Sequence, residues 1–244
     1  VGNTYPLHYA QAFYDGLKAA GETEIVSLVR CAWAGSQRYG ALIWSGDIQS
    51  SFASMRNQLS AGLNMGLSGI PWWTTDIGGF HGGHVDDPAF HELLVRWFQW
   101  AVFSPVLRMH GYRDPVTPPA VPFRDGVAQC DSGAGNELWS FGEDVFVILS
   151  GYADLRERLR PYVRELMRAA HEQGDPLMRT LFYAFPGDIS CWEVDDQYMF
   201  GGDILVAPIL EAGETERSVY LPRGADWVNA WTGRVFAGGE TVVC

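Results

Sequence analysis

Four residues that could take part in acid–base chemistry or bind a polar ligand each follow a short apolar run. They are Arg30, Asp47, Asp76 and His110. A carboxylic acid can give a proton to a departing oxygen, whereas a guanidinium and an imidazole can hydrogen-bond hydroxyl groups. We interpret each apolar run as a buried strand, so each polar residue would stand at the carboxyl end of a strand. In a (β/α)8 barrel that end is the catalytic face, and its catalytic groups come from several strands.

Aromatic residues and glycines flank the two acidic residues. Trp44 stands three positions before Asp47 in the segment Trp-Ser-Gly-Asp, and two tryptophans and Phe80 lie around Asp76. An exposed ring beside glycine suits the apolar C–H side of a sugar, whereas an enclosed ring would belong to the core. A strand-end carboxylate with aromatic surfaces beside it is what an enzyme acting on sugars would need.

Each of these residues also has an ordinary structural interpretation. Asp47 could cap a helix that begins near Ser51. Asp76 precedes Ile-Gly-Gly and could belong to a turn. Arg30 could be the partner of a buried carboxylate, and His110 could be a structural histidine. The residue types alone leave these alternatives open.

The chain shows no pattern typical of a metal site. His81 and His84 lack the carboxylate–histidine or Cys/His spacing that would support a metal, so a polar loop is the better interpretation. The four cysteines are scattered, and we expect free thiols at Cys31, Cys130, Cys191 and Cys244. We therefore expect no metal site.

The elements that must position these residues alternate along most of the chain. Apolar spacing predicts helices at 6–17, from 51 onward, from 88 onward and at 145–166, strands at 25–29, 41–44, 70–74 and 105–109, and a long loop at 112–136. Alternating strands and helices predict βαβ units and a parallel sheet. After about Pro186, short apolar runs separated by Gly, Pro and Asp predict an antiparallel β domain.

Composition excludes several classes of function. The net charge of −12 argues against a nucleic-acid partner. No apolar run approaches the roughly 20 residues that span a membrane. The chain begins with valine and ends within an apolar run, so we interpret it as an internal piece of a larger protein.

Several segments, in order along nearly the whole chain, resemble glycoside hydrolase family 31, which contains retaining α-glucosidases and α-xylosidases. The resemblance rests on Trp-Ser-Gly-Asp at 44–47, Gly-Leu-Asn-Met-Gly at 62–66, Trp-Thr-Thr-Asp-Ile-Gly-Gly-Phe at 73–80, Arg-Met-His-Gly at 108–111 and Tyr-Met-Phe-Gly-Gly-Asp-Ile-Leu-Val-Ala-Pro at 198–208. It implies an α/β fold: the C-terminal half of a (β/α)8 TIM barrel at 1–185, followed by the start of an antiparallel β domain at 186–244.

The resemblance also implies roles by position. Asp47 would be the general acid/base, first protonating the glycosidic oxygen and later activating water. Arg30 and His110 would hydrogen-bond sugar hydroxyls in the −1 subsite. Asp76 would bind a hydroxyl or orient its neighbours, notably Arg30.

Two aromatic residues would complete the sugar pocket. Trp44 and Phe80 would line it, and apolar rings around Asp47 would favour the protonated acid through desolvation. Retaining hydrolysis needs a second carboxylate about 5–5.5 Å from the acid. In the family that nucleophile comes from a barrel strand upstream of residue 6, so the isolated chain is expected to be inactive.

The implied partner is the non-reducing end of an oligosaccharide, together with the remainder of the same barrel. The resemblance implies no obligatory metal or organic cofactor. α-Glucoside and α-xyloside substrates are not distinguished. A family member that only binds carbohydrate, a glucan lyase and a transglycosylase remain alternatives, and a metal-dependent barrel enzyme is the least favoured.

Overall fold

The computed structural model describes residues 2–119 and 130–244. Its helices are α1 (Tyr5–Ala19), α2 (Phe52–Leu67), α3 (Pro88–Ala101), α4 (Glu143–Gln173) and α5 (Leu181–Ala184), with 3-10 turns at Gly2–Thr4, Ser36–Tyr39, Leu138–Phe141 and Ile189–Trp192. Its strands are β1 (Ser27–Val29), β2 (Ala41–Trp44), β3 (Trp73–Thr74), β4 (His81–His84), β5 (Tyr112–Thr117), β6 (Ser132–Ala134), β7 (Met178–Thr180), β8 (Tyr198–Phe200), β9 (Ile204–Val206), β10 (Ser218–Tyr220), β11 (Asp226–Val228), β12 (Val235–Ala237) and β13 (Thr241–Val243).

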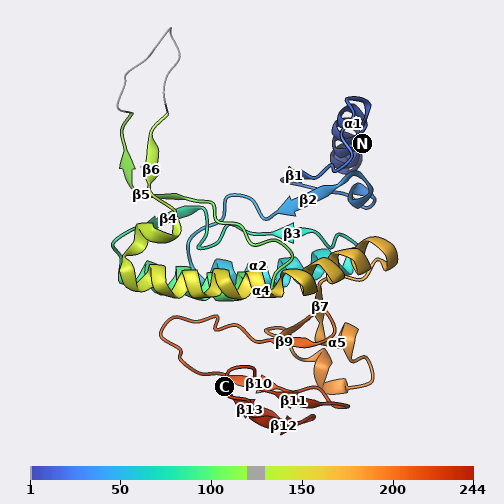
Figure 1. Cartoon of the computed structure of the whole chain (residues 1–244), viewed down its shortest axis with the longest axis vertical. Helices are drawn as coiled ribbons and strands as arrows, with labels where there is room; N and C mark the ends of the chain where they lie inside the picture. The colour runs from blue at the N-terminus through green and yellow to red at the C-terminus, as the bar shows by residue number, and fades with distance from the viewer. Residues whose placement is uncertain (1, 120–129) are drawn as a thin grey trace.

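The first part of the chain is an open parallel sheet with helices packed against it. β1, β2 and β3 pair in that order, with Val29 opposite Ile43 and Ile43 opposite Trp73. In Figure 1 this sheet lies on one side of α2 and α4, and the strands from β9 to β13 lie on the other side. The sheet is not closed, as expected for part of a barrel.

Local signals in the sequence explain where the main helices begin. Ser51 accepts a hydrogen bond from the backbone N–H of Ser54 and so caps α2. Asp87 accepts one from the N–H of Ala89 and caps α3, and Pro88 occupies the first turn of that helix. The helices predicted from 51 and from 88 are therefore confirmed.

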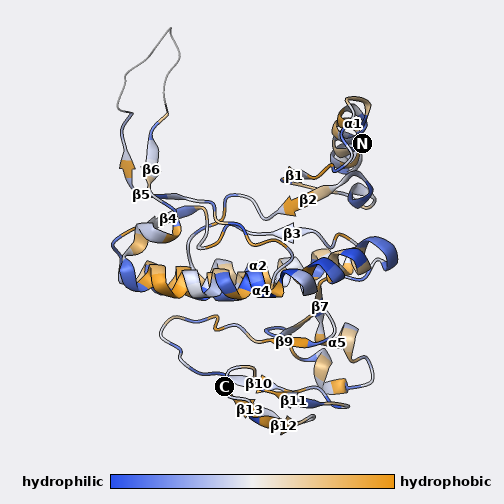
Figure 2. Ribbon diagram, viewed as in Figure 1, coloured by the Kyte–Doolittle hydropathy of each residue, from blue (hydrophilic) through white to orange (hydrophobic). Residues whose placement is uncertain are grey.

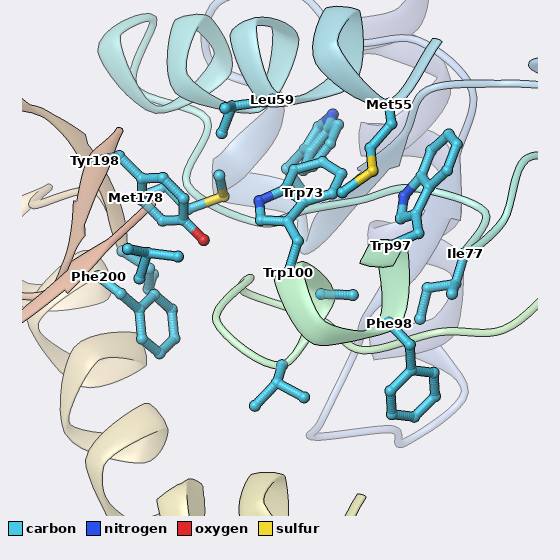
Figure 3. Packing of buried hydrophobic residues seen from close by; sticks show 14 of the residues in the cluster. Met55, Leu59, Trp73, Ile77, Trp97, Phe98, Trp100, Met178, Tyr198 and Phe200 are labelled. Carbon is cyan, nitrogen blue, oxygen red and sulfur yellow. The ribbon is translucent and has the colours of Figure 1, made fainter. Parts of the chain in front are cut away.

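The core lies where α2 and α3 meet β3 and the sheet formed by β7, β8 and β9. Figure 3 shows Trp73 between Met55 and Leu59 on one side and the α3 tryptophans on the other. The rings of Trp73 and Trp100 are 6.1 Å apart. The rings of Trp73, Trp97 and Trp100 thus pack together within this core.

Helix α4 changes character along its length. Its apolar residues gather toward the N-terminal end, and the C-terminal end is mostly hydrophilic (Figure 2).

Several predicted elements differ from the structure. The segment with His81 and His84, interpreted as a polar loop, is strand β4, which pairs with β5. The strand predicted at 105–109 is wrong: the segment is not a strand, although it follows β3 closely through a bond from Thr74 Oγ1 to the carbonyl oxygen of Val106. Pro105 has no N–H to donate, and β3 is only two residues long, so no ladder forms.

The long loop predicted at 112–136 is wrong at its two ends. There β5 and β6 pair in antiparallel fashion and form a hairpin that projects from the molecule (Figure 1). The part of that predicted loop at 120–129 lies outside the described residues.

Antiparallel pairing dominates the last part of the chain, as predicted, and it begins at β7, which precedes the predicted start near Pro186. β7 pairs with β8 and β8 with β9, while β10 pairs with β13 and β11 with β12. Side chains join this region to the barrel helices. Tyr198 donates a 2.7 Å hydrogen bond to the carbonyl oxygen of Phe103, and Arg56 forms a 2.9 Å ion pair with Glu211. The two regions thus pack directly against each other.

Candidate active site

Three of the predicted site residues stand at one edge of the parallel sheet. Arg30 follows β1 directly, Asp47 lies three residues beyond β2, and Asp76 lies two residues beyond β3. Because the strands run parallel, their carboxyl ends bring these side chains to the same edge. The structure therefore gathers residues that are widely spaced in the sequence.

Arg30 and Asp47 form an ion pair above a tryptophan. Arg30 Nη2 lies 2.7 Å from Asp47 Oδ1, and the guanidinium sits 5.2 Å from the centre of the Trp44 ring. Ser51 caps α2, so Asp47 is not the helix cap that its position allowed. The Asp47 side chain is 34% exposed, which differs from the enclosure by apolar rings that the sequence suggested. Its carboxylate is open to a ligand from solvent.

Glycines shape the loops that carry the two acidic residues. Gly46 has φ 81° and turns the chain immediately before Asp47. Gly79 has φ 80°, and a Cβ there would lie 2.6 Å from the Cα of Ser50. The loop after β3 can thus touch the loop after β2, and the bond from the N–H of Phe80 to the carbonyl oxygen of Ile48 (2.7 Å) fixes this contact.

Asp76 is fully buried and pairs with Arg108 through Oδ1. The sequence suggested Arg30 as the residue that Asp76 orients, and the structure gives Arg108 instead because Arg30 pairs with Asp47. The carbonyl oxygen of Asp76 also accepts from Gly79, so the predicted turn is present as well. Asp76 Oδ2 has no hydrogen-bond partner among the described residues.

Burial raises the pKa of the Asp76 carboxyl above its ordinary value, and this is the largest effect on it. The nearby Arg108 and His110 act in the opposite direction, while the negative charge of Asp47 adds to the increase. These electrostatic contributions place Asp47, Asp76, Arg108 and His110 in one neighbourhood.

His110 and Phe80 form the other side of this neighbourhood. Their rings are tilted with centres 5.3 Å apart, and His110 is exposed. The two sides are joined at the strand ends, where Ser45 Oγ donates a 3.1 Å hydrogen bond to Thr75 Oγ1. The result is an exposed carboxylate, an imidazole and two aromatic side chains at one edge, supported by a buried ion pair.

The sequence points to Arg30, Asp47, Asp76 and His110 but not to two arginines. Arg108 lies in the segment Arg-Met-His-Gly, and no local spacing pairs it with an acid 32 positions away. Arg113 lies in a segment predicted as loop, whereas the structure buries it completely. Both arginines contact residues far away in the sequence, and such contacts cannot be inferred from local sequence patterns.

Among the residues that the structure describes, no group of three or more His, Cys, Asp or Glu side chains could hold a metal ion. The four cysteines are free thiols, as predicted, with Cys191 buried and the others exposed. In the described ranges, no helix is long and apolar enough to cross a membrane.

Comparison with known families decides where this chain belongs. The model for the glycosyl hydrolases family 31 TIM-barrel domain matches residues 1–166, and the model for the family's C-terminal domain matches residues 174–244. The chain belongs to glycosyl hydrolase family 31. The resemblance inferred from its motifs is confirmed, as is a partial TIM barrel followed by a β domain.

Relatives in this family include enzymes with different substrates. An α-xylosidase of Saccharolobus solfataricus is 38% identical over 98% of this chain, which spans 30% of that relative. An α-glucosidase of the same organism is 35% identical over 99% of this chain, which spans 32% of it. The family 31 chain thus covers about a third of the length of these curated relatives.

A solved structure provides a further comparison. The crystal structure of a family 31 α-xylosidase from a soil metagenome, complexed with xylose, aligns with a TM-score of 0.97 and 62% identity. The alignment covers 100% of this chain and 36% of that protein. The open sheet and β domain seen here thus match part of a larger fold.

Proposed function

We propose that the full-length polypeptide containing this family 31 chain hydrolyses terminal α-glycosidic bonds at the non-reducing end of an oligosaccharide. The observation that carries the proposal is the Arg30–Asp47 pair over Trp44, at the carboxyl edge of a family 31 barrel sheet. We favour an α-xyloside as substrate, because a xylose-binding α-xylosidase is 62% identical over the whole chain. An α-glucoside is the second candidate, supported by the α-glucosidase relative.

Asp47 is the general acid/base in this proposal. Its carboxyl proton goes to the glycosidic oxygen as the bond to the anomeric carbon breaks and a nucleophilic carboxylate bonds to that carbon, so the alcohol departs. In the second step the Asp47 carboxylate takes a proton from the water that attacks the same carbon and displaces the nucleophile. Partial exposure of Asp47 gives substrate and water access to both steps.

The nucleophile comes from outside this chain in our proposal. Asp76 is a second carboxylate that interacts electrostatically with Asp47, yet it is fully buried and paired with Arg108. A nucleophile must reach the anomeric carbon, so Asp76 suits a supporting role. We infer that an upstream barrel strand supplies the nucleophilic carboxylate and closes the pocket.

The remaining site residues bind and orient the sugar. Arg30 and His110 present exposed hydrogen-bond donors, while Trp44 and Phe80 offer ring faces to the C–H side of the sugar. Asp76 holds Arg108 and, with it, the segment that leads to His110. We also propose that the upstream barrel elements cover the free edge of β1 and the exposed face of α1.

The test uses the full-length polypeptide with 4-nitrophenyl α-xyloside, 4-nitrophenyl α-glucoside and the corresponding unactivated disaccharides. Asp47→Asn should lower kcat/KM for the disaccharides by about 10²–10⁴-fold, and less for the aryl glycosides, whose leaving group needs little protonation. Asp86→Asn is the matched control, because that side chain is 87% exposed and should leave turnover unchanged.

Product analysis separates the alternative activities. A hydrolase releases the monosaccharide, a lyase would give an unsaturated anhydro-sugar, and a transglycosylase would give longer oligosaccharides. Turnover of an aryl α-glycoside by the isolated 244-residue chain, abolished by Asp47→Asn, would contradict an upstream nucleophile. Unchanged turnover in the full-length Asp47→Asn enzyme would contradict the role of Asp47.

A further inference from the structure

Arg113 on β5 is a buried cation whose contacts are hydrogen-bond acceptors without formal charge. It is fully buried, and its guanidinium lies 4.7 Å from the centre of the Phe90 ring. No carboxylate forms an ion pair with it among the described residues. Burial lowers the pKa of the guanidinium to about 10, so the group remains charged at neutral pH. Removing a charge from water costs free energy, which favourable contacts in the folded protein must offset.

The contacts of Arg113 lie on the loops that carry the candidate site. Nη1 donates to Ser50 Oγ (3.2 Å), three residues beyond Asp47. Nη2 donates to the carbonyl oxygen of Ile77 (3.1 Å), the residue next to Asp76. One guanidinium therefore bonds both loops that hold the two acidic side chains.

Three further contacts extend this connection. Nη1 also donates to the carbonyl oxygen of Gly82 (3.0 Å), and Nε donates to Asn136 Oδ1 (2.7 Å). A Cβ at Gly111 would lie 2.5 Å from Nη2, so the residue after His110 packs its backbone against the guanidinium. Arg113 thus touches the chain within three residues of Asp47, Asp76 and His110.

We propose that Arg113 is a positioning residue for the glycosidase site, which fixes the loops after β2 and β3 and the segment before Gly111 relative to one another. The proposal rests on the proposed function for its catalytic consequence. The planar fork of arginine reaches several acceptors in fixed directions, whereas the ammonium of lysine is a compact charge on a flexible stem. Charge alone is therefore insufficient, and the geometry of the fork is what the three loops require.

The first measurement is amide hydrogen exchange in the full-length polypeptide carrying Arg113→Lys. Exchange in 45–51, 76–83 and 109–112 should become at least about tenfold faster, because each segment loses a bond or a packing contact. Ser50→Ala is a milder variant that removes one acceptor and should affect 45–51 and 80–83 only. It keeps the test available if Arg113→Lys fails to fold.

Arg156→Lys is the matched control. Burial likewise lowers the pKa of Arg156 to about 10. This residue donates to the carbonyl oxygens of Val102, Ser104 and Pro105, which follow α3 and lie outside the three site segments. It should lower Tm without changing exchange in the three site segments. Equal acceleration of those segments in Arg156→Lys would overturn the proposal, as would wild-type exchange in Arg113→Lys.

Kinetics supply a readout that loss of folded enzyme would not give. Arg113→Lys should raise KM and lower kcat/KM by about 100-fold, since misplaced groups weaken both sugar binding and proton transfer. A smaller folded fraction would lower apparent kcat with KM unchanged, and that result would overturn the proposal. If the wild-type polypeptide cleaves no α-glycoside, the proposed function fails, while hydrogen exchange still decides whether Arg113 holds the loops.

Discussion

The side chain of Asp76 is an acidic group buried away from water. The carboxylate is fully buried, and Arg108, whose side chain is 21% exposed, is its ion-pair partner. Taking a carboxylate out of water costs several kcal/mol unless an opposite charge and hydrogen bonds offset it. The ionised form of Asp76 therefore depends on Arg108, and removal of Arg108 should lower the stability of the folded protein.

Replacement of Arg108 by methionine tests this dependence. Arg108→Met should lower the free energy of unfolding by about 3–5 kcal/mol at neutral pH, because it leaves an uncompensated buried charge. Burial already raises the pKa of Asp76, and loss of Arg108 raises it further. The native variant then binds a proton more readily than the unfolded chain, so its stability falls as pH rises above the ordinary carboxyl pKa of 3.8. Urea denaturation at pH 5 and pH 7.5 measures both effects.

Arg56→Met provides the control for this prediction. Arg56 and Glu211 form an exposed ion pair, with side chains 45% and 56% exposed, whose loss should cost less than about 1 kcal/mol. The double variant Asp76→Asn with Arg108→Met should recover part of the stability lost in Arg108→Met. A cost for Arg108→Met no larger than that for Arg56→Met would contradict a buried, paired Asp76.

At the level of elements, helices were easier to predict from the sequence than strands. Ser51 and Asp87 signal helix starts locally, because a capping side chain bonds an N–H only two or three residues away. β3 was predicted at 70–74, but its ladder with β2 covers only Trp73 and Thr74, and Pro71 has no N–H to donate. Strand limits depend on a distant partner, which apolar runs do not specify.

The hairpin of β5 and β6 shows the same limit more strongly. Its first strand reads Tyr-Arg-Asp-Pro-Val-Thr, a composition typical of loops. The strand exists because β4 and β6 pair on its two sides and because Arg113 is held beneath it. The candidate site shows the same limit. The strand-end positions of Arg30, Asp47 and Asp76 were predicted, whereas His110 follows no strand and the contacts of Arg108 and Arg113 depend on distant residues.

Helix α2 packs against β3 through a residue without a side chain. A Cβ at Gly62 would lie 2.9 Å from two ring atoms of Trp73. Gly62→Ala should therefore lower the free energy of unfolding by about 1–3 kcal/mol, since neither the helix nor the enclosed ring can move freely. Urea denaturation followed by tryptophan fluorescence measures the change.

Gly16 on α1 is the matched control, because a Cβ there would meet nothing within 4 Å. Alanine has the higher helix propensity, so Gly16→Ala should be stabilising by about 0.5–1 kcal/mol. Small and equal changes in the free energy of unfolding at the two positions would contradict the close contact between Gly62 and the Trp73 ring.

For the whole molecule, the two regions are joined by buried as well as exposed contacts. The Tyr198 hydroxyl is buried and bonds the chain at the end of α3, while Glu92 accepts from the N–H of Gly213 at 2.7 Å. The family and the order of its two parts were predicted from motifs spread over nearly the whole chain. The packing of the β domain on α2 and α3 was not predicted, because its contacts join residues more than 90 positions apart.

One side of the molecule leaves apolar groups in water. On α1 an aromatic and aliphatic stripe repeats every four residues and is 39–64% exposed: Tyr5, Tyr9, Phe13 and Leu17. Leu28 on the neighbouring β1 is 45% exposed, and in the described ranges β1 pairs with β2 alone. Figure 1 shows α1 standing apart from the other helices. A contiguous apolar surface of this kind tends to be buried against protein.

The isolated chain should therefore bind the dye ANS and self-associate at micromolar concentration, because no residue that the structure describes covers this stripe. The double variant Tyr9→Ser with Phe13→Ser should reduce both signals, as measured by ANS fluorescence and sedimentation velocity. Trp139→Ser is the control: this ring is 68% exposed at the 3-10 turn Leu138–Phe141, outside the α1 stripe, and its loss should change neither signal. In the full-length polypeptide the proposed upstream barrel elements cover α1, so ANS binding should be low before any substitution. An isolated chain that stays monomeric and binds no ANS would contradict this account of the open side.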